Sequence, residues 1–500
     1  MVHTLVVVDK KEDWALSLGN IDNVEIVEAR SYIKNKAYNG IRYAHVLNLC
    51  RSYTYQKLGY YVSLIATARG HRPQPTLKAI EDFKSPSMIR FVSNELDEII
   101  QKSLKHIVSD HFLMSVYFGK NIAKCYDRLA SELYKQFHAP FLEAKFSYYK
   151  NKWVLVNVTP IATSQIPGHH HDFATACIFK YLQGRRISPA HKKLSRYDLA
   201  ILYNPEEKFP PSNKKAIQRF VKAAESLGFN VEMVQKNDIG RLFEFDALLI
   251  RETTRVNHYT YRFARKAKAN GLEVIDDPDS ILKCCNKVYL AELLEKHQIL
   301  IPKTIILERD DVEKMVSYLS YPCILKQPDS SFSRGVVKVQ TPEEFREQAL
   351  SFLADSDLLI IQEFLPTAFD WRIGVFDGEA LFACKYFMAK DHWQVYNHSK
   401  KGNSFAGDAE TIAVGQVPKH VVKTALRAAQ FVGDGLYGVD LKEVGGKCYV
   451  IEINDNPNVD AGIEDEVLGD ALYLKILATM AGRLDKKRNL LPKMKKEDAS

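Results

Sequence analysis

Three oxygen-bearing side chains in the C-terminal part of the chain have a spacing that could hold a metal ion. Asp440 lies in a run that alternates apolar and polar residues, and Glu452 and Asn454 lie in a second run of this kind. A turn signal at 445–447 separates the two runs, so the sequence predicts a β-hairpin. A three-residue turn there would place Asp440 opposite Glu452. Asn454 would share the face of Glu452, because side chains two positions apart on a strand point to the same side.

Magnesium is the ion that such a hairpin would suit. Mg²⁺ usually takes one or two carboxylates and completes its shell with phosphate oxygens and water. We expect Val439, Ile451 and Ile453 to lie on the opposite, apolar face of the hairpin. The alternative interpretation is a solvated face with scattered acids. The polar turn residues at 455–458 follow at once and favour the metal site.

A lysine and a small-residue loop upstream could bind phosphate. Lys326 ends an apolar run that is predicted to be a strand, and a loop with Ser333, Arg334 and Gly335 leads to the returning strand. The backbone N–H groups of such a loop can point at phosphate oxygens, while the lysine supplies a point charge. An ordinary serine-rich hairpin is the alternative interpretation of this segment.

Further candidate residues lie on both sides of this loop. Lys287 begins a predicted helix, and alone it would be a surface lysine. Gln362 and Glu363 end a buried apolar run, where a carboxylate and free backbone groups could hold an adenine and a ribose. Arg372 follows on the next predicted strand, and its planar guanidinium suits oxyanions. Lys385 lies on the strand after that, as one of many lysines on strand faces.

The composition of the chain is that of an ordinary globular protein. Its 500 residues allow two to four domains, with 46% apolar and 26% charged residues. The net charge of +8 is mild for this length and does not indicate a nucleic-acid-binding protein. The eight cysteines form no CxxC pair, which indicates reduced thiols. We find no signal peptide and no membrane-spanning run, so we expect a cytoplasmic protein.

The pattern along the chain changes three times. Residues 1–190 are expected to form a mixed α/β domain, with a strand at 5–8, helical patterning from about 93 to 135 and a strand near 153–158. Residues 191–280 alternate strands and helices, which indicates a small parallel sheet, and Ser212 is expected to cap the first of these helices. Residues 281–485 contain mostly strands with hairpin turns, and 486–500 form a basic tail.

Taken in order, these residues resemble the ATP-grasp superfamily, and within it the RimK-like ligases. The resemblance covers about residues 190–480, and residues 1–190 resemble the N-terminal domain that is attached to some RimK-like proteins. It implies an α/β and α+β chain: an ATP-grasp fold, a preceding small parallel α/β domain and an extra N-terminal domain. The motifs that carry it are Lys287, Lys326 with its loop, and the segments 361–364, 370–372, 438–440 and 452–457.

The resemblance also implies roles for single residues. Lys287 and Lys326 would contact the α- and β-phosphates of ATP, beside the loop residues Ser333, Arg334 and Gly335. Gln362, Glu363 and Phe364 would line the adenine and ribose. Asp440, Glu452 and Asn454 would hold two Mg²⁺ ions, with Mn²⁺ as an alternative. Arg372 would steady the γ-phosphate and an acyl intermediate, and Lys385 and Asn397 are further candidates for the same region.

The implied activity is an ADP-forming carboxylate–amine ligase that works through an acyl phosphate. It would join an amino acid to an amino acid, a peptide or a protein. Two other functions stay open: a phosphotransferase on the same fold, and a nucleotide-gated binding module whose first 190 residues bind a protein partner. The expected partners are small molecules or peptides, with no nucleic acid and no membrane, and a homo-oligomer is compatible with the sequence.

Two local features bear on the substrate. Residues 386–398 are rich in aromatic side chains and lack the paired arginines expected of a close RimK relative, which puts glutamate as the added amino acid in doubt. Residues 251–254 follow the carboxyl end of a predicted strand, where α/β sheets place ligands. They could help to shape an acceptor pocket, or they could form a salt-bridged loop.

Overall fold

The computed structural model describes residues 4–13, 24–41, 44–83, 85–184, 195–329, 335–389, 392–395 and 407–488. By its internal contacts the chain divides into two compact units, residues 1–197 with 484–500, and residues 198–483. Each unit is described by itself. None of the described helices combines the length and apolar character needed to cross a membrane. All eight cysteines are free thiols.

The first unit begins with a parallel sheet in the order β2-β1-β3-β4. Its strands are β1 (Thr4–Val8), β2 (Val24–Glu28), β3 (His45–Asn48) and β4 (Arg72–Gln74). The apolar side chains of β1 alternate between the two faces of the sheet. One face packs against α1 (Ala29–Lys34) and α2 (Leu58–Ala68), and the other packs against α7 (His171–Gly184). The strand predicted at 5–8 is thus confirmed.

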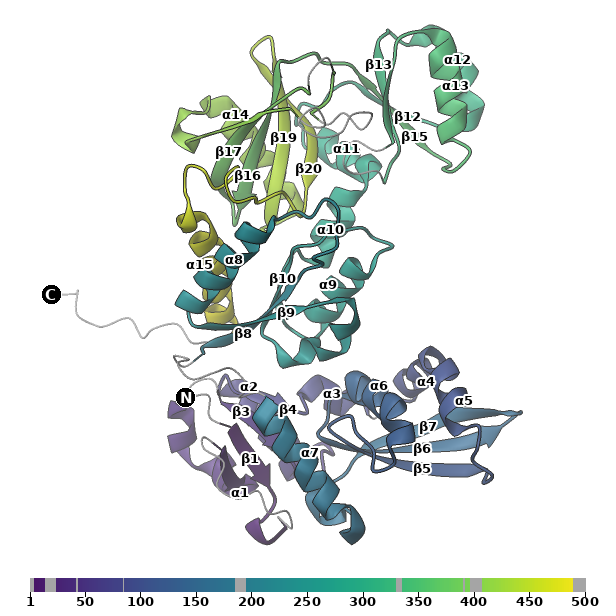
Figure 1. Cartoon of the computed structure of the whole chain (residues 1–500), viewed down its shortest axis with the longest axis vertical. Helices are drawn as coiled ribbons and strands as arrows, with labels where there is room; N and C mark the ends of the chain where they lie inside the picture. Colours follow the sequence, from purple (N-terminus) through teal and green to yellow (C-terminus); the bar gives the residue numbers. More distant parts are fainter. Residues whose placement is uncertain are drawn as a thin grey trace, which may run out of the picture. The chain divides into compact units, whose positions relative to one another are not determined.

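An antiparallel sheet, β5-β6-β7, forms the rest of the first unit (Figure 1). Its strands are β5 (His111–Tyr117), β6 (Phe141–Tyr149) and β7 (Lys152–Pro160), and its helices are α3 (Leu77–Asp82), α4 (Pro86–Glu95), α5 (Asp97–Leu104) and α6 (Asp127–Phe137). The strand predicted near 153–158 is confirmed within β7. The continuous helical region predicted from 93 to 135 is wrong, because β5 interrupts it. This segment is rich in aromatic and apolar side chains, and it pairs with β6 along its whole length.

The second unit opens with a small parallel sheet in the order β11-β10-β8-β9. Its elements are β8 (Tyr197–Leu202), α8 (Lys214–Ser226), β9 (Phe229–Val234), β10 (Ala247–Ile250), α9 (Tyr259–Ala269) and β11 (Glu273–Ile275). The parallel α/β pattern predicted here is confirmed. The predicted cap is wrong, because Asn213 caps α8 by accepting a hydrogen bond from the amide of Ala216. Ser212 instead donates to the carbonyl of Val459 at 2.8 Å.

Two antiparallel sheets follow in the second unit. The first has the order β12-β15-β13-β14, and α12 (Val312–Tyr318) and α13 (Pro342–Phe352) pack on one side of it (Figure 1). Its strands are β12 (Thr304–Leu307), β13 (Cys323–Lys326), β14 (Val336–Val339) and β15 (Leu359–Glu363). Lys326 and Glu363 each end a strand, and because these neighbouring strands run antiparallel, Lys326 pairs with Ile360 and Glu363 pairs with Cys323.

The second antiparallel sheet has the order β18-β17-β16-β19-β20. Its strands are β16 (Phe369–Phe376), β17 (Glu379–Phe387), β18 (Ala409–Ile412), β19 (Leu436–Val444) and β20 (Lys447–Asn454). One face packs against α14 (Lys419–Val432) and α11 (Lys287–Lys296) in a continuous apolar core. The remaining helices are α10 (Pro278–Cys285) and α15 (Asp470–Lys487). The opposite face of this sheet carries the polar residues of the candidate site.

Candidate active site

Two glycines make the turn between β19 and β20. Val444 pairs with Lys447, so the turn consists of Gly445 and Gly446 alone, and the predicted three-residue turn is wrong. Both glycines have positive φ angles, 57° and 72°, which a type I′ hairpin turn requires. A two-residue turn by itself would shift the pairing of the strands by one residue.

A β-bulge restores the expected pairing of the two acids. The register shifts directly after Asp440, so Asp440 pairs with Glu452 and Ile451 is left as the extra residue of β20. Ile451 therefore lines the pocket, whereas it was expected on the opposite face. Val439 and Ile453 are fully buried, as their place on the apolar face requires.

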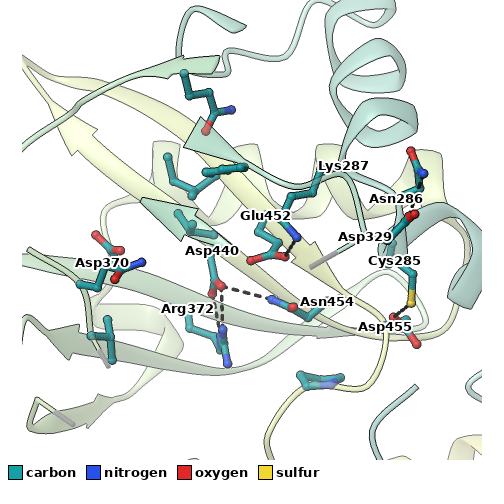
Figure 2. A pocket seen from close by; sticks show the side chains of 18 of the residues that line it. Cys285, Asn286, Lys287, Asp329, Asp370, Arg372, Asp440, Glu452, Asn454 and Asp455 are labelled. Atoms are coloured by element: carbon teal, nitrogen blue, oxygen red, sulfur yellow. Dashed lines mark hydrogen bonds and ion pairs between the residues drawn. The ribbon is translucent and has the colours of Figure 1, made fainter. Parts of the chain in front are cut away.

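A pocket of about 630 Å³ lies over this hairpin, within the usual size range for small-molecule sites. Its walls come from both antiparallel sheets, from the start of α11 and from the loops 253–257 and 455–458. Figure 2 shows how the polar side chains of α11, β16, β19 and β20 converge there. Nine of the residues predicted from the sequence line this pocket: Lys287, Lys326, Gln362, Glu363, Phe364, Arg372, Asp440, Glu452 and Asn454.

The remaining predicted residues are not among those that line the pocket in the described part of the chain. Gly335 is not among the lining residues, and Ser333, Arg334 and Asn397 lie outside the described residues. Lys385 does not line the pocket either, and its ammonium pairs with Glu410 at 2.9 Å. Arg372 pairs with Cys384 across β16 and β17, so the next residue along β17, Lys385, points to the other face of the sheet.

The residues predicted to bind metal form a network of charge-assisted contacts (Figure 2). Arg372 donates two hydrogen bonds to Asp440, from Nε to Oδ1 and from Nη2 to Oδ2, both at 2.6 Å. Asn454 Nδ2 donates to the same Oδ2 at 3.2 Å, and Lys287 Nζ lies 3.2 Å from Glu452 Oε1. The predicted trio of Asp440, Glu452 and Asn454 is thus adjacent in space, and basic residues neutralise both acids.

The pKa values of these groups reflect burial and neighbouring charge. Burial alone would raise the pKa of Glu452, but Lys287 and Lys326 outweigh it and lower this pKa. Burial raises the pKa of Asp440, although Arg372 opposes the rise. Burial also lowers the pKa of Lys326 to about 8, and Lys287 and Lys442 contribute to the shift. Each of these groups would gain from an oppositely charged ligand.

The residues described can hold magnesium only together with another source of oxygen atoms. Among the described residues, no group of three or more His, Cys, Asp or Glu side chains is arranged to bind a metal ion. Asp440 and Glu452 supply two carboxylates, and Asn454 adds an amide oxygen. This donor set fits Mg²⁺ that arrives with phosphate oxygens, because Mg²⁺ needs few protein ligands in such sites.

A third ion pair lies among the residues that line the pocket, and it was not predicted from the sequence. Lys442 Nζ lies 2.5 Å from Asp370 Oδ1, and both side chains line the pocket. The spacing could have predicted that this pair faces the pocket. Lys442 lies two residues after Asp440 on β19, and Asp370 lies two residues before Arg372 on β16, so each shares the face of its neighbour.

Aromatic rings cover the end of β15. Phe364 lies edge-on to Trp393 with 6.0 Å between ring centroids, and both line the pocket. Lys338 Nζ lies 4.6 Å from the centre of the Phe364 ring. Glu363 Oε1 accepts a hydrogen bond from the amide of Lys303 at 2.9 Å. Flat apolar surface beside fixed polar groups suits a planar heterocycle such as adenine.

A fully buried arginine joins the small parallel sheet to the loop after β20. Arg251 Nη1 donates to Asn456 Oδ1 at 2.8 Å, and Nη2 donates to the carbonyls of Pro457 and Pro211 at 2.8 and 2.5 Å. Its partners are neutral oxygens, so the expected alternative of a salt-bridged loop does not describe Arg251. Pro457 can approach because Gly438 has no Cβ, which would lie 2.8 Å from the proline ring.

Two models of known protein families match the chain, one in each unit. Residues 284–478 match the RimK-like ATP-grasp domain, and residues 29–176 match the RimK-like ATP-grasp N-terminal domain. The chain belongs to the RimK-like ATP-grasp family. The resemblance proposed from the residues 287–457 is therefore confirmed, and so is the ATP-grasp fold.

The individual relatives of this RimK-like protein share little sequence identity with it. "Alpha-aminoadipate--LysW ligase LysX" of Sulfurisphaera tokodaii is 27% identical over 192 residues, which are 37% of this chain and 64% of the relative, less than two thirds of its length. "Probable alpha-L-glutamate ligase" of Teredinibacter turnerae is 25% identical over 44% of this chain and 71% of the relative. The crystal structure of a RimK domain ATP-grasp protein from Sphaerobacter thermophilus aligns with a TM-score of 0.43 at 15% identity, over 56% of this chain and 98% of that one.

Proposed function

We propose that this protein is an ATP-dependent carboxylate–amine ligase that releases ADP and phosphate. The observation that supports the proposal is that the side chains predicted to bind phosphate and metal ions line one pocket. Lys287 and Lys326 stand beside Glu452, and Arg372 stands beside Asp440. The two relatives described above are named as ligases of amino acids.

The reaction would take two steps. A substrate carboxylate oxygen attacks the γ-phosphorus of ATP, the bond from this phosphorus to the bridging oxygen breaks, and ADP leaves as the acyl phosphate forms. The amine then attacks the acyl carbon, the bond to the phosphate oxygen breaks, and phosphate leaves as the amine loses a proton. Lys287 and Lys326 would neutralise phosphate charge, and Arg372 would steady the transferring group. The second step is easier because phosphate is a good leaving group.

Divalent ions complete the proposal. Asp440, Glu452 and Asn454 would hold two Mg²⁺, or Mn²⁺ in their place, against the phosphates of ATP. Bound ions would supply positive charge where the phosphoryl group develops negative charge. Arg372 would be released from Asp440 as the ion binds, which leaves its guanidinium available for the substrate phosphoryl group.

The substrates would be amino acids, peptides or the end of a protein. The names of the two relatives contain two acidic amino acids, glutamate and α-aminoadipate, and one of the names also contains LysW. Free amino acids, and dipeptides that imitate the end of a protein, therefore belong in the first screen.

The decisive experiment measures ADP release with amino acids and dipeptides, in the presence and absence of hydroxylamine. We expect ADP release and a hydroxamate, because hydroxylamine captures an acyl phosphate. Release of AMP would contradict the acyl-phosphate route. ADP release without a hydroxamate would indicate a phosphotransferase, and ATP that is bound but never cleaved would indicate a binding module. Lys326→Met should abolish turnover, and Lys423→Met on the exposed side of α14 is the matched control.

A further inference from the structure

The pocket continues past the residues assigned to the nucleotide. Its far end is formed by the loop 253–257, between β10 and α9, and by the last residues of α10. The loop follows the carboxyl end of a parallel strand, where α/β sheets place their ligands. Cys285 Sγ lies 3.7 Å from the carbonyl oxygen of Thr254, so the loop and the end of α10 are in contact.

Two large apolar side chains at the far end are exposed. Val256 in the loop is 38% exposed and Leu282 on α10 is 46% exposed, and both line the pocket. Leu282 lies three residues before Cys285, so the two share the side of α10 that meets the loop. A single exposed apolar side chain is ordinary on a protein surface. Two in one pocket offer apolar area that a ligand can remove from water.

The polar side chains beside this loop are engaged with one another. Thr254 Oγ1 donates to Asp455 Oδ2 at 2.7 Å. Asn456 Nδ2 donates to the carbonyl of Glu252 at 2.5 Å, and Asn456 Oδ1 accepts from Arg251 Nη1 at 2.8 Å. These hydrogen bonds fix the loop against the segment after β20 and occupy the groups that could otherwise bind a polar side chain of a ligand.

The charges around the far end have both signs. Arg255 and Asp455 both line the pocket. Glu207 accepts hydrogen bonds from the backbone of the loop, and Glu252 accepts one from the hydroxyl of Tyr259. Acids and bases thus stand close together here, so the local charge does not favour an anionic side chain over a neutral one.

The wall that comes from the connection between β17 and β18 is uncharged. The described residues of 386–395 that line the pocket are Tyr386, Trp393, Gln394 and Val395. The hydroxyl of Tyr386 donates to Glu464. No arginine occurs anywhere in 386–398. An acidic side chain of a substrate would therefore find no basic partner on this wall.

The far end adjoins the residues that are predicted to hold phosphate and metal ions. Helix α10 ends at Cys285, two residues before Lys287, and the segment 455–458 directly follows Asn454. A substrate carboxylate that attacks the γ-phosphorus would lie between these two chain segments. The rest of the same substrate molecule would then extend towards the far end of the pocket.

We propose that Val256 and Leu282 bind an apolar side chain of the substrate whose carboxylate is phosphorylated. This inference rests on the proposed ligase function and adds the class of its carboxylate substrate. That substrate is an amino acid, or a peptide that ends in one, with an aliphatic side chain of the size of leucine or methionine. Burial of this side chain against the two residues provides the selectivity.

The test measures ADP release and hydroxamate formation by the full-length protein with ATP, Mg²⁺ and excess hydroxylamine. The probes are L-methionine, L-glutamine and L-glutamate, each as the free amino acid and as the last residue of a glycyl dipeptide. Their side chains have nearly the same length and differ in polarity. We expect kcat/KM to be at least about tenfold higher with methionine, because an apolar site leaves a buried amide or carboxylate without hydrogen-bond partners.

Substitutions in the far end then test the two residues directly. In Leu282→Ser we expect KM for the methionine probe to rise roughly tenfold, while KM for ATP stays unchanged, because only apolar area of the substrate site is lost. Val256→Ser should act in the same way from the loop, so the test does not depend on one variant. Leu350→Ser is the matched control, because Leu350 is also exposed on a helix, α13, and does not line the pocket.

Glutamine or glutamate used as well as methionine by the wild-type protein would overturn the inference. Equal KM values for methionine in Leu282→Ser, Val256→Ser and Leu350→Ser would also overturn it. Absence of ADP release with every probe would count against the ligase function itself. In that case calorimetric titration of the probes into the protein with ADP and Mg²⁺ still decides the question. Binding of methionine that Leu282→Ser weakens supports the inference, and binding of no probe, or of all probes alike, contradicts it.

Discussion

Lys326 shows at the scale of one residue how the pocket is prepared for an anion. Its side chain is partly buried at the end of β13, beside the charges of Lys287 and Lys442. Burial and these like charges lower its pKa to about 8, and Glu452 offsets only part of the shift. A phosphate oxygen in the pocket would restore the missing counter-charge, so nucleotide binding and protonation of Lys326 should be coupled.

This coupling predicts how nucleotide affinity depends on pH. Only the protonated form of Lys326 binds phosphate well, so the Kd for ADP with Mg²⁺ should be flat below about pH 8. Above that value Kd should rise, approaching about tenfold per pH unit. Lys326→Arg keeps its charge throughout, because the pKa of arginine exceeds about 12, and its Kd should stay flat over the same range. Calorimetric titration across pH measures both. A rise of the same size in both proteins would assign the effect to another group.

Two β-bulges decide, at the scale of elements, which predicted residues reach the pocket. The bulge in β20 pairs Asp440 with Glu452 in spite of the short turn. A second bulge between Gly374 and Val375 shifts the register of β16 and β17. Without it, Lys385 would pair with Asp370 and share the pocket face, because a shift of one residue exchanges the faces of a strand. The bulge therefore places Lys385 on the face of the sheet opposite the pocket.

Much of the site could be predicted because spacing along one strand is visible in the sequence. Asp440, Glu452 and Asn454 were predicted in this way. Lys326 was predicted from its place at the end of an apolar run before a small-residue loop, and Arg372 from the resemblance to the family. Bulges could not be predicted, because they depend on tertiary contacts such as the ring of Phe382, which lies over Gly374 where a Cβ would be only 2.2 Å from it. The interruption of the first unit's helical pattern by β5 has the same origin, since its partner β6 is distant in sequence.

The hydrogen bonds of Arg251 should stabilise the contact between the end of β10 and the segment after β20. Arg251→Met would leave the carbonyls of Pro211 and Pro457 without their buried donors. We expect the free energy of unfolding of the second unit to fall by at least about 2 kcal/mol, since each unsatisfied buried group costs about 1–3 kcal/mol. Arg255→Met in the same loop should change it by less than about 0.5 kcal/mol, because that side chain is exposed. Urea unfolding measures the free energy of unfolding of both variants. An equal decrease in the two would contradict a stabilising role for the hydrogen bonds of Arg251.

The whole molecule combines two units with separate apolar cores. The cores of the first unit lie around β1 and β3, and those of the second lie around the small parallel sheet and the two antiparallel sheets. The two family matches fall one in each unit, at 29–176 and 284–478. The sequence predicted a change of pattern near residue 190, where a new series of alternating strands and helices begins. No role for the first unit could be predicted from the sequence, because the resemblance in this part of the chain rests on no motif with an assigned chemistry.

Separate cores predict separate unfolding transitions, and only one of them should respond to nucleotide. All described residues of the pocket belong to the second unit. At a concentration of ADP with Mg²⁺ about 100 times Kd, binding stabilises that unit by about 2.7 kcal/mol, which should raise its Tm by roughly 5–10 °C. Differential scanning calorimetry should then show one transition moving and the other staying in place. Lys326→Met should remove the shift and leave both transitions visible. A single transition that moves as a whole would mean that the two units unfold as one, and that nucleotide bound at β13 and β20 stabilises the first unit as well.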